Sequence, residues 1–452
     1  MCRRLLLLCL GTLLAAAASC DSPSPPAAPP TDEAATPPES TVPPEAATPT
    51  EPAPADDPPA PEAATPPERP SPAGGTFALT RKTATAGEMP ALRMGTRFCP
   101  RRSGPNQGLT GVPPDAAEAD AFYTLHLDEG LRWAVCVPGD PPRLLVDTDN
   151  DKDFADETPI TGEVQQTSID YGTVDLALKD GGTATVRLMG NAMKPGDPPR
   201  YMLMMPGAYC TGTVTLAGKE YALAVIDGNM NGRFNDAFAG EVRYSDLDGL
   251  ALDLNGNGTF DLPRGMEGPF ETTPLGKRLR VGEAFYDVTP APDGSQITLQ
   301  PVEPGFGTVD VGTAEAALLA YSDYGIWQTT TSAEGTVRLP AGRYAVIRLA
   351  VKKKDASGQV WQLTMTEPPK TLQPLVVEQG KTLRVAVGPP LVAEVDVQQR
   401  NRQARLNLML RGAAGERYVP GVQKGNRRTP PPTFEILGDD DKVLHTGKFE
   451  YG

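Results

Sequence analysis

The chain of 452 residues contains only two histidines, His126 and His445. A histidine-rich metal site and a relay of several imidazoles are therefore excluded, because each needs more ring nitrogens than two side chains supply. Basic residues are also few, since 42 Lys and Arg stand against 57 Asp and Glu, which gives a net charge of −15. Phosphate binding requires clustered Lys and Arg, so this balance argues against nucleic acid as a partner.

The sequence also lacks the motifs that carry common catalytic chemistry. It has no Gly-x-Ser-x-Gly elbow, no His-Glu-x-x-His, no Cys-x-x-Cys and no phosphate-binding loop. His126 alternates with leucines as a strand residue does, and His445 lies in a predicted terminal hairpin, so we expect structural roles for both. A carboxylate pair about 5–10 Å apart, as glycosidases use, stays open because acids are plentiful.

Proline is in excess, at 49 of 452 positions, about twice its ordinary share of roughly 5%. Since proline breaks helix interiors, a helix-rich fold is excluded. Alternating apolar residues flank turn-forming residues at 180–182, 217–218, 292–294 and 340–342, which predicts hairpins. One short helix is predicted over Asp115–Tyr123, after Pro113 and Pro114. The expected fold is mostly β, with antiparallel β-sandwich-type domains.

The N-terminus has the order of an export signal. Arg3 and Arg4 precede an apolar run from Leu5 to Ala18, and a serine then leads to Cys20. The run is shorter than the roughly 20 residues of a membrane-spanning helix. It resembles a bacterial lipoprotein signal, although Ala17 stands where that family usually has Leu. The resemblance implies a signal peptide over residues 1–20, acylation of Cys20, and a lipid-anchored, extracytoplasmic place in the cell envelope. Inner and outer membrane both stay open, and so does a plain signal peptide cleaved nearby.

Residues 21–75 form a predicted disordered tether. Nineteen prolines lie between Asp21 and Pro72, and ten acidic residues but no Lys or Arg lie between Asp21 and Glu68. Glu-Ala-Ala-Thr-Pro occurs three times, at Glu33, Glu45 and Glu62. Few apolar residues and many prolines leave nothing to form a core. We expect the segment to hold the folded part away from the lipid.

The folded part is predicted to divide near Pro304. Residues 76–303 are expected to form a β-rich body that carries three acidic loops. Residues 304–390 are expected to form an immunoglobulin-like β-sandwich, and residues 391–452 a C-terminal β-module. The Leu-Pro-Ala-Gly-Arg-Tyr sequence at Leu339–Tyr344 resembles the hairpin of carboxypeptidase-regulatory-like domains.

Three loops place oxygen-bearing side chains at their first, third and fifth positions, and each has Phe at its eighth. Calcium prefers six to eight oxygen ligands at about 2.3–2.6 Å, and alternate positions of a tight loop direct their oxygens to one point. The sequence therefore predicts calcium as the cofactor. The candidate ligands are Asp147, Asp149, Asp151 and Asp153 in loop one, Asp227, Asn229, Asn231 and Asp236 in loop two, and Asp253, Asn255, Asn257 and Asp261 in loop three.

The pattern resembles the first nine positions of the EF-hand loop, and equally the dockerin and thrombospondin type 3 calcium loops. Three departures matter. None of the loops has Glu at position 12, so a bidentate ligand must come from elsewhere, and Asp246 and Asp248 are candidates for it. Loop one has Lys152 where the others have the turn glycine, at a cost on the order of 1 kcal/mol if positive φ is required. The flanks read as strands, so we expect no helix–loop–helix opening switch.

Beyond Cys20 the chain has three cysteines, Cys99, Cys136 and Cys210. At most one disulfide can form among three, and the sequence does not choose the pair.

The sequence thus predicts a membrane-anchored envelope lipoprotein with a calcium-stabilised β-rich body and a structural or adhesive role. Its partners would be the membrane, through the anchor, and an envelope protein or glycan. The alternative is a calcium-dependent extracytoplasmic hydrolase that acts on glycans or surface polymers. Two facing carboxylates in a pocket away from the loops would favour the hydrolase.

Overall fold

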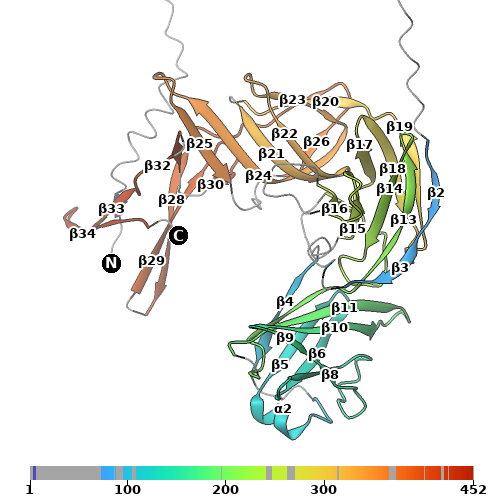
Figure 1. The fold of residues 1–452 in the computed structure, drawn as a ribbon. Helices are drawn as coiled ribbons and strands as arrows, with labels where there is room; N and C mark the ends of the chain where they lie inside the picture. The colour runs from blue at the N-terminus through green and yellow to red at the C-terminus, as the bar shows by residue number, and fades with distance from the viewer. Residues whose placement is uncertain are drawn as a thin grey trace, which may run out of the picture.

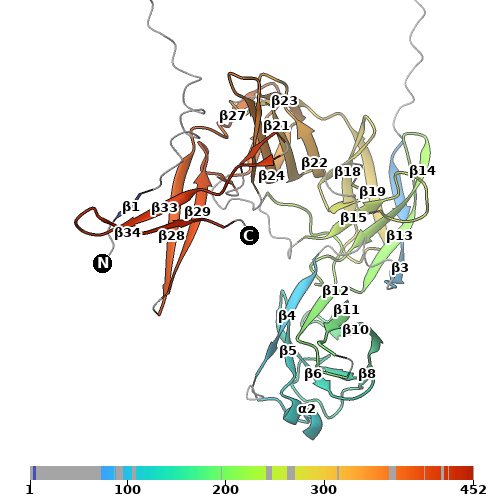
Figure 2. The same ribbon diagram turned by 60° about the vertical axis from the view of Figure 1, so that its left-hand side comes forward.

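The computed structural model is built almost entirely of antiparallel β-sheets, which confirms the predicted mostly β, sandwich-containing fold (Figure 1). In both views a barrel-like unit lies below a sandwich (Figure 2). A third unit lies beside the sandwich, and two hairpins lie beyond the third unit, farthest from the sandwich. The structure describes residues 4–6, 73–85, 87, 95–103, 108–194, 196–240, 247–261, 270–312, 315–365, 373–401, 403–418, 422–425 and 427–450.

The barrel-like unit is one nine-stranded sheet. Its two edge strands, β8 and β9, are separated in the chain by Gly162 alone, so the sheet curls back to its own start. In sheet order its strands are β8 (Ile160–Thr161), β7 (Arg143–Val146), β6 (Gly130–Val137), β5 (Phe122–Leu127), β4 (Arg97–Arg102), β12 (Tyr201–Pro206), β11 (Thr183–Asn191), β10 (Ser168–Ala177) and β9 (Glu163–Gln165).

Alternate residues of these strands fill the interior of the barrel-like unit. Tyr123, Leu144, Leu176 and Leu188 are fully buried there, although they come from four different strands. A side chain at Gly162 would collide with Ile169, 2.4 Å from the added carbon, so the closing corner needs glycine.

The sandwich packs a five-stranded sheet on a four-stranded one. The chain enters through β2, changes sheets at the buried Leu79 and continues into β3. The first sheet is β16 (Thr272–Pro274), β15 (Gly249–Leu252), β14 (Lys219–Ile226), β13 (Ala208–Leu216) and β3 (Thr80–Thr83), and the second is β17 (Arg278–Val281), β18 (Ala284–Pro290), β19 (Gln296–Val302) and β2 (Gly75–Ala78).

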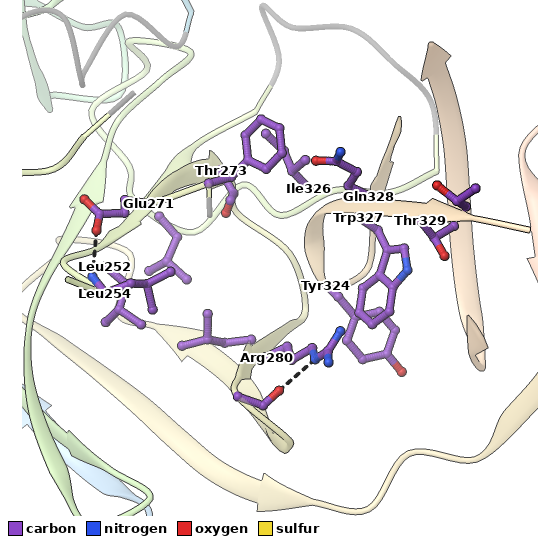
Figure 3. A pocket seen from close by; sticks show the side chains of 15 residues that line it. Leu252, Leu254, Glu271, Thr273, Arg280, Tyr324, Ile326, Trp327, Gln328 and Thr329 are labelled. Atoms are coloured by element: carbon purple, nitrogen blue, oxygen red, sulfur yellow. Dashed lines mark hydrogen bonds between the residues drawn. The ribbon is translucent and has the colours of Figure 1, made fainter. Parts of the chain in front are cut away.

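The third unit has its own core cluster, which Phe285 of the sandwich and Leu410 and Tyr418 of the following strands also join. A cleft of about 570 Å³ lies between this unit and the sandwich (Figure 3). The strands are β20 (Phe306–Asp310), β21 (Ala316–Ser322), β22 (Gly325–Thr330), β23 (Thr336–Pro340), β24 (Gly342–Lys354), β25 (Val360–Met365), β26 (Leu375–Val377), β27 (Thr382–Arg384), β28 (Val392–Arg400), β29 (Gln403–Arg411), β30 (Arg417–Tyr418), β31 (Gln423–Lys424), β32 (Arg427–Arg428), β33 (Thr433–Leu437) and β34 (Val443–Lys448).

Three of the four predicted hairpins form, as β10–β11, β13–β14 and β18–β19. The fourth predicted hairpin, at residues 340–342, is wrong. Strands β23 and β24 flank Ala341 but do not pair, because β23 pairs with β20 and β24 pairs with β21 in another sheet. The chain therefore turns a corner between two sheets there, which alternation alone cannot distinguish from a hairpin.

The predicted helix is shorter than expected. Helix α2 spans Pro114–Ala119, and Asp120 ends it in the left-handed conformation with φ of 51°. Phe122 and Tyr123 belong instead to β5, where both are fully buried between neighbouring strands. Burial in the sheet overrides the local preference for helix at these positions.

Residues 1–3 and 7–72, which include most of the predicted signal peptide and of the predicted tether, lie outside the described residues, and the tether as predicted ends at Gly75, the first residue of β2. Arg4–Leu6 form strand β1, which pairs with β33. No helix in the described part of the chain has the length and apolar character needed to cross a membrane.

The barrel core should be intolerant of truncation. We expect Leu188→Ala to lower the free energy of unfolding by about 2–5 kcal/mol, because it leaves a cavity in a fully buried position. Leu131→Ala, at a leucine that is 48% exposed, should change it by about 0.5 kcal/mol or less. Chemical unfolding of the two variants measures the difference, and equal losses would contradict the assigned core.

Candidate metal sites

Each of the three acidic loops begins where a strand ends. Loop one follows β7, loop two follows β14 and loop three follows β15. The first aspartates of the loops are all buried, with exposed fractions of 0% for Asp147, 6% for Asp227 and 4% for Asp253. The predicted strand–loop arrangement is therefore present, and each loop starts from a carboxylate at the margin of a core.

The first aspartate organises each loop by accepting hydrogen bonds from its own backbone. Asp227 accepts from the N–H groups of Asn231 at 3.0 Å and Gly232 at 2.8 Å. Asp253 accepts in the same way from positions five and six of loop three, at 3.2 and 2.8 Å. In loop one Asp147 accepts from Lys152 at 3.4 Å. The carboxylate thus holds the turn that brings positions three and five back toward it.

Position six of every loop has positive φ. Gly232 and Gly258 both have φ of 80°, and Lys152 has φ of 67°. Glycine adopts this conformation freely, whereas a residue with a side chain loses roughly 1 kcal/mol or more there. Loop one therefore has the same backbone shape as the others, and it keeps that shape at a cost.

The eighth residue of each loop anchors it to a core, as the sequence predicts. Phe154 and Phe234 are almost fully buried, with exposed fractions of 2% and 1%. Phe260 is partly buried against a smaller cluster beside the sandwich. These rings fix the ends of the loops, so the polar positions between them are held in place.

An additional acid closes each loop from outside positions one to nine. Asp248 accepts from Gly228 at 3.1 Å and from Asp236 at 2.7 Å. Glu271 accepts from the N–H groups of Leu254, Asn255 and Asp261 in loop three, and Glu157 accepts from the N–H of Thr148 in loop one. The sequence offered Asp248 as a candidate but missed Glu157 and Glu271. Its other candidate, Asp246, lies outside the described residues.

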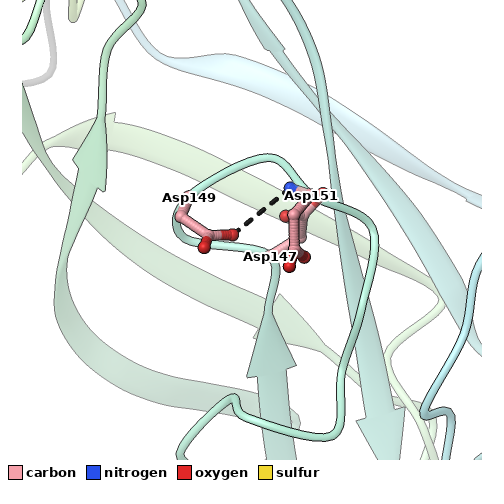
Figure 4. A group of neighbouring side chains, drawn as sticks. All are labelled: Asp147, Asp149 and Asp151. Atoms are coloured by element: carbon pink, nitrogen blue, oxygen red, sulfur yellow. Dashed lines mark hydrogen bonds between the residues drawn. The ribbon is translucent and has the colours of Figure 1, made fainter.

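Loop one gathers three carboxylates. One oxygen each of Asp147, Asp149 and Asp151 lies within 4.8 Å of the other two (Figure 4). The Oδ2 atom of Asp147 is buried and has no hydrogen-bond partner. Asp153 is not part of this group, and its carboxylate accepts from the N–H of Ala155 instead. A buried, unpartnered carboxylate oxygen beside two further carboxylates fits a cation, because the arrangement is costly without one.

Loops two and three use amides at positions three and five. In loop two the Nδ2 atoms of Asn229 and Asn231 donate to Asp236 at 3.0 and 2.7 Å. In loop three Asn255 and Asn257 donate to Asp261 at 2.9 and 2.8 Å. The two amides of each of these loops thus converge on one carboxylate, and a half-turn of each amide exchanges its nitrogen for its oxygen.

The carboxylates of loop two are held in an unfavourable setting. Burial raises the pKa of Asp227 to about 6, and neighbouring Asp236 adds to the rise. Burial also raises the pKa of Asp248, with a further contribution from the charge of Asp227. In loop one the pKa of Asp147 is raised, again chiefly by burial. A cation would relieve this repulsion.

Loop two is also the joint between two units. Met230 at its fourth position is fully buried in the core of the barrel-like unit, and Phe234 is buried in the core of the sandwich. Arg97 of the barrel donates to the carbonyl of Asn229 at 2.7 Å. The candidate ligands of loop two are therefore carried on a segment that is anchored in two different cores.

The cysteines and histidines considered in the sequence do not form a candidate site comparable to the acidic loops. Cys99, Cys136 and Cys210 are all buried and unbonded to one another. Burial raises the pKa of Cys136 and of Cys210 to about 11, so neither thiol is activated. His126 and His445 are exposed strand residues. Comparison of the chain with protein-family models, with curated proteins and with solved structures finds no match.

The buried acids of loop two predict a pH dependence in the presence of chelator. Because the pKa of Asp227 rises from 3.8 to about 6 on folding, its contribution to stability is full below pH 4 and is lost as the pH rises through 6. The difference corresponds to roughly 3 kcal/mol. Thermal melting of the parent and of Asp227→Asn in chelator, from pH 4 to 7.5, should show a smaller decline in the variant. Identical profiles would contradict this assignment.

Proposed function

We propose that this chain is a lipid-anchored protein of the bacterial cell envelope whose β-rich body is stabilised by calcium. Its role is structural or adhesive, and it binds a protein or glycan outside the membrane. The anchor rests on the order of residues that precedes Cys20. The proposal of calcium binding is based on the three loops, and the strongest observation in its favour comes from loop one.

That observation is the unpartnered Oδ2 atom of Asp147. The atom is buried at the end of β7, and carboxylate oxygens of Asp149 and Asp151 lie within 4.8 Å of its carboxylate. Two neighbouring negative charges raise the energy of a buried carboxylate whose second oxygen has no donor, whereas a hard cation lowers it. Asp147, Asp149 and Asp151 would hold the ion in loop one.

Oxygen ligands alone favour calcium over a transition metal. The loops contain no His and no Cys, which are the ligands that zinc and copper prefer. Loop two would use Asp227, Asn229, Asn231 and Asp236, and loop three would use Asp253, Asn255, Asn257 and Asp261. Without a bidentate Glu at position 12 we expect dissociation constants on the order of 10⁻⁴–10⁻³ M, as in extracellular modules.

The hydrolase alternative has no specific observation in its favour. The cleft beside the sandwich has one carboxylate, Glu271, which loop three engages, and the cavity beneath β29 has one, Glu450. The cavity beside loop two has four carboxylates: Asp128, Glu129 and Asp180 are each paired with an arginine, and Asp236 accepts from Asn229 and Asn231. None of these cavities presents two free carboxylates that face each other, so the binding role is the better supported one.

The third position of each loop gives a direct test of calcium binding. Its side chain accepts one bond from its own turn, at 2.9–3.2 Å, and in loops two and three it also donates to Asp236 or Asp261. In chelator we expect Asp149→Ala to melt close to the parent, and Asn229→Ala and Asn255→Ala to melt somewhat below it because each loses the donated bond. In millimolar calcium each should lose part of the stabilisation, about 1.4 kcal/mol per site at a tenfold excess over the dissociation constant.

Asp197→Ala, at an exposed acid outside the loops, is the control and should keep the full calcium response. If the parent itself melts at the same temperature in chelator and in calcium, the proposal fails. A response that only Asp149→Ala reduces would confine the site to loop one.

The anchor is tested separately. We expect Cys20→Ala to move the exported protein from the membrane fraction to the soluble fraction, because stable attachment needs acyl chains on that residue. Cys9→Ala, at a cysteine within the apolar run, should leave fractionation unchanged. A Cys20→Ala protein that stays with the membrane as the parent does would contradict acylation.

A further inference from the structure

The cleft between the sandwich and the third unit is built from the margins of several sheets. Its walls come from β15, β16 and β17 on the sandwich side and from β22 on the other (Figure 3). β16 is the end strand of the five-stranded sheet, β17 of the four-stranded sheet and β22 of the seven-stranded sheet. Three sheet edges therefore meet at one cavity, and an edge strand offers main-chain groups for pairing with another strand.

The edge of β22 faces the cleft along most of its length. Five consecutive residues, Ile326–Thr330, line the cavity. Side chains of a strand alternate between its two faces, so five in succession can border one space only along the main chain. Its one paired neighbour in the described part of the chain is β21.

The cleft is closed at one end by a contact between its walls. A carbon added at Gly325 would lie 2.7 Å from Thr273 Oγ1, and one added at Gly276 would lie 2.5 Å from the nitrogen of Gly325. Glycine at both positions allows β16 and β22 to meet there. No ladder joins the two strands, so the rest of the β22 edge has no strand partner among the described residues.

The floor of the cleft is apolar. Leu250 and Leu252 line it from β15 but belong to the sandwich core, with exposed fractions of 3% and 4%. Leu254, just beyond β15, and Trp327, on the opposite wall, are only partly buried. Apolar contact with a ligand is therefore available at Leu254 and at the Trp327 ring.

Arg280 supplies a positive charge at this apolar surface. Its guanidinium lies 5.1 Å from the centre of the Trp327 ring, and its Nε donates to the carbonyl of Gly282 at 2.8 Å. It forms no ion pair with an acid of the described residues, and the one carboxylate in the cleft, Glu271, is engaged by loop three. The remaining guanidinium donors are suited to a carboxylate brought by a ligand.

We propose that this cleft binds an extended peptide segment of a partner protein, added as a strand to the free edge of β22. An apolar side chain of the peptide packs against Leu254 and Trp327, and a carboxylate of the peptide pairs with Arg280. Main-chain hydrogen bonds give affinity in this mode, and the side-chain contacts give selectivity. The inference names the partner class for the binding role proposed above and does not depend on the anchor.

The test uses the full chain in calcium and a displayed library of random twelve-residue peptides. Selected peptides should carry an apolar residue and an Asp, Glu or free C-terminus. Arg280→Ala should weaken their binding about tenfold or more, the loss expected for a charge-assisted contact. Arg280→Glu should select peptides with Lys or Arg instead. On binding, amide hydrogen exchange should slow at residues 325–330.

The matched control is Arg338→Ala. Arg338 is likewise exposed and lies 4.6 Å from the centre of an aromatic ring, that of Phe306, but it is outside the cleft, so binding should be unchanged. The proposal is overturned if no peptide is selected, if selected peptides bind Arg280→Glu as they bind the parent, or if only oligosaccharides bind and Trp327→Ala abolishes it. Melting curves of the same samples report the calcium response separately from peptide binding.

Discussion

Burial of one carboxylate at the start of each loop is the constraint on which the acidic loops depend. Asp147, Asp227 and Asp253 are buried at strand ends, where a bare anion is strongly disfavoured. In each loop backbone N–H groups donate hydrogen bonds to that carboxylate, and this turn requires positive φ at position six. That turn then carries positions three and five back toward the acid. The proposed ligand geometry is thus a consequence of how the buried acid is satisfied.

The loops also connect parts of the molecule that are otherwise separate. Loop two places Met230 in the barrel core and Phe234 in the sandwich core. The conformation of this loop therefore helps to determine how the two units are positioned relative to each other. Loop three shares Leu254 and Glu271 with the cleft against the third unit. A cation that stiffens these loops would therefore act on the joints of the body, which is where a rigid display surface needs stiffness.

The sequence predicted what is local. Positions one, three, five, six and eight of each loop lie within a few residues of one another, so their spacing alone specified the turn and the aromatic anchor. Glu271 was missed because it reaches loop three through the pairing of β15 with β16, and no spacing rule carries that information. The same limit explains β23 and β24, whose alternation was read correctly while their partners, in different sheets, were not.

Loop one combines the most negative charge of the three loops with the least favourable backbone conformation. It has the least favourable backbone, with Lys152 at φ of 67°, and the densest charge. Loop one forms the same turn as the two glycine loops, although Lys152 has an unfavourable backbone conformation in it. It differs from them in its ligands, because positions three and five are carboxylates and not amides. More negative charge strengthens cation binding, and stronger binding can offset a strained turn of about 1 kcal/mol. On this reasoning loop one, and not the better-shaped loops two and three, should bind calcium most tightly.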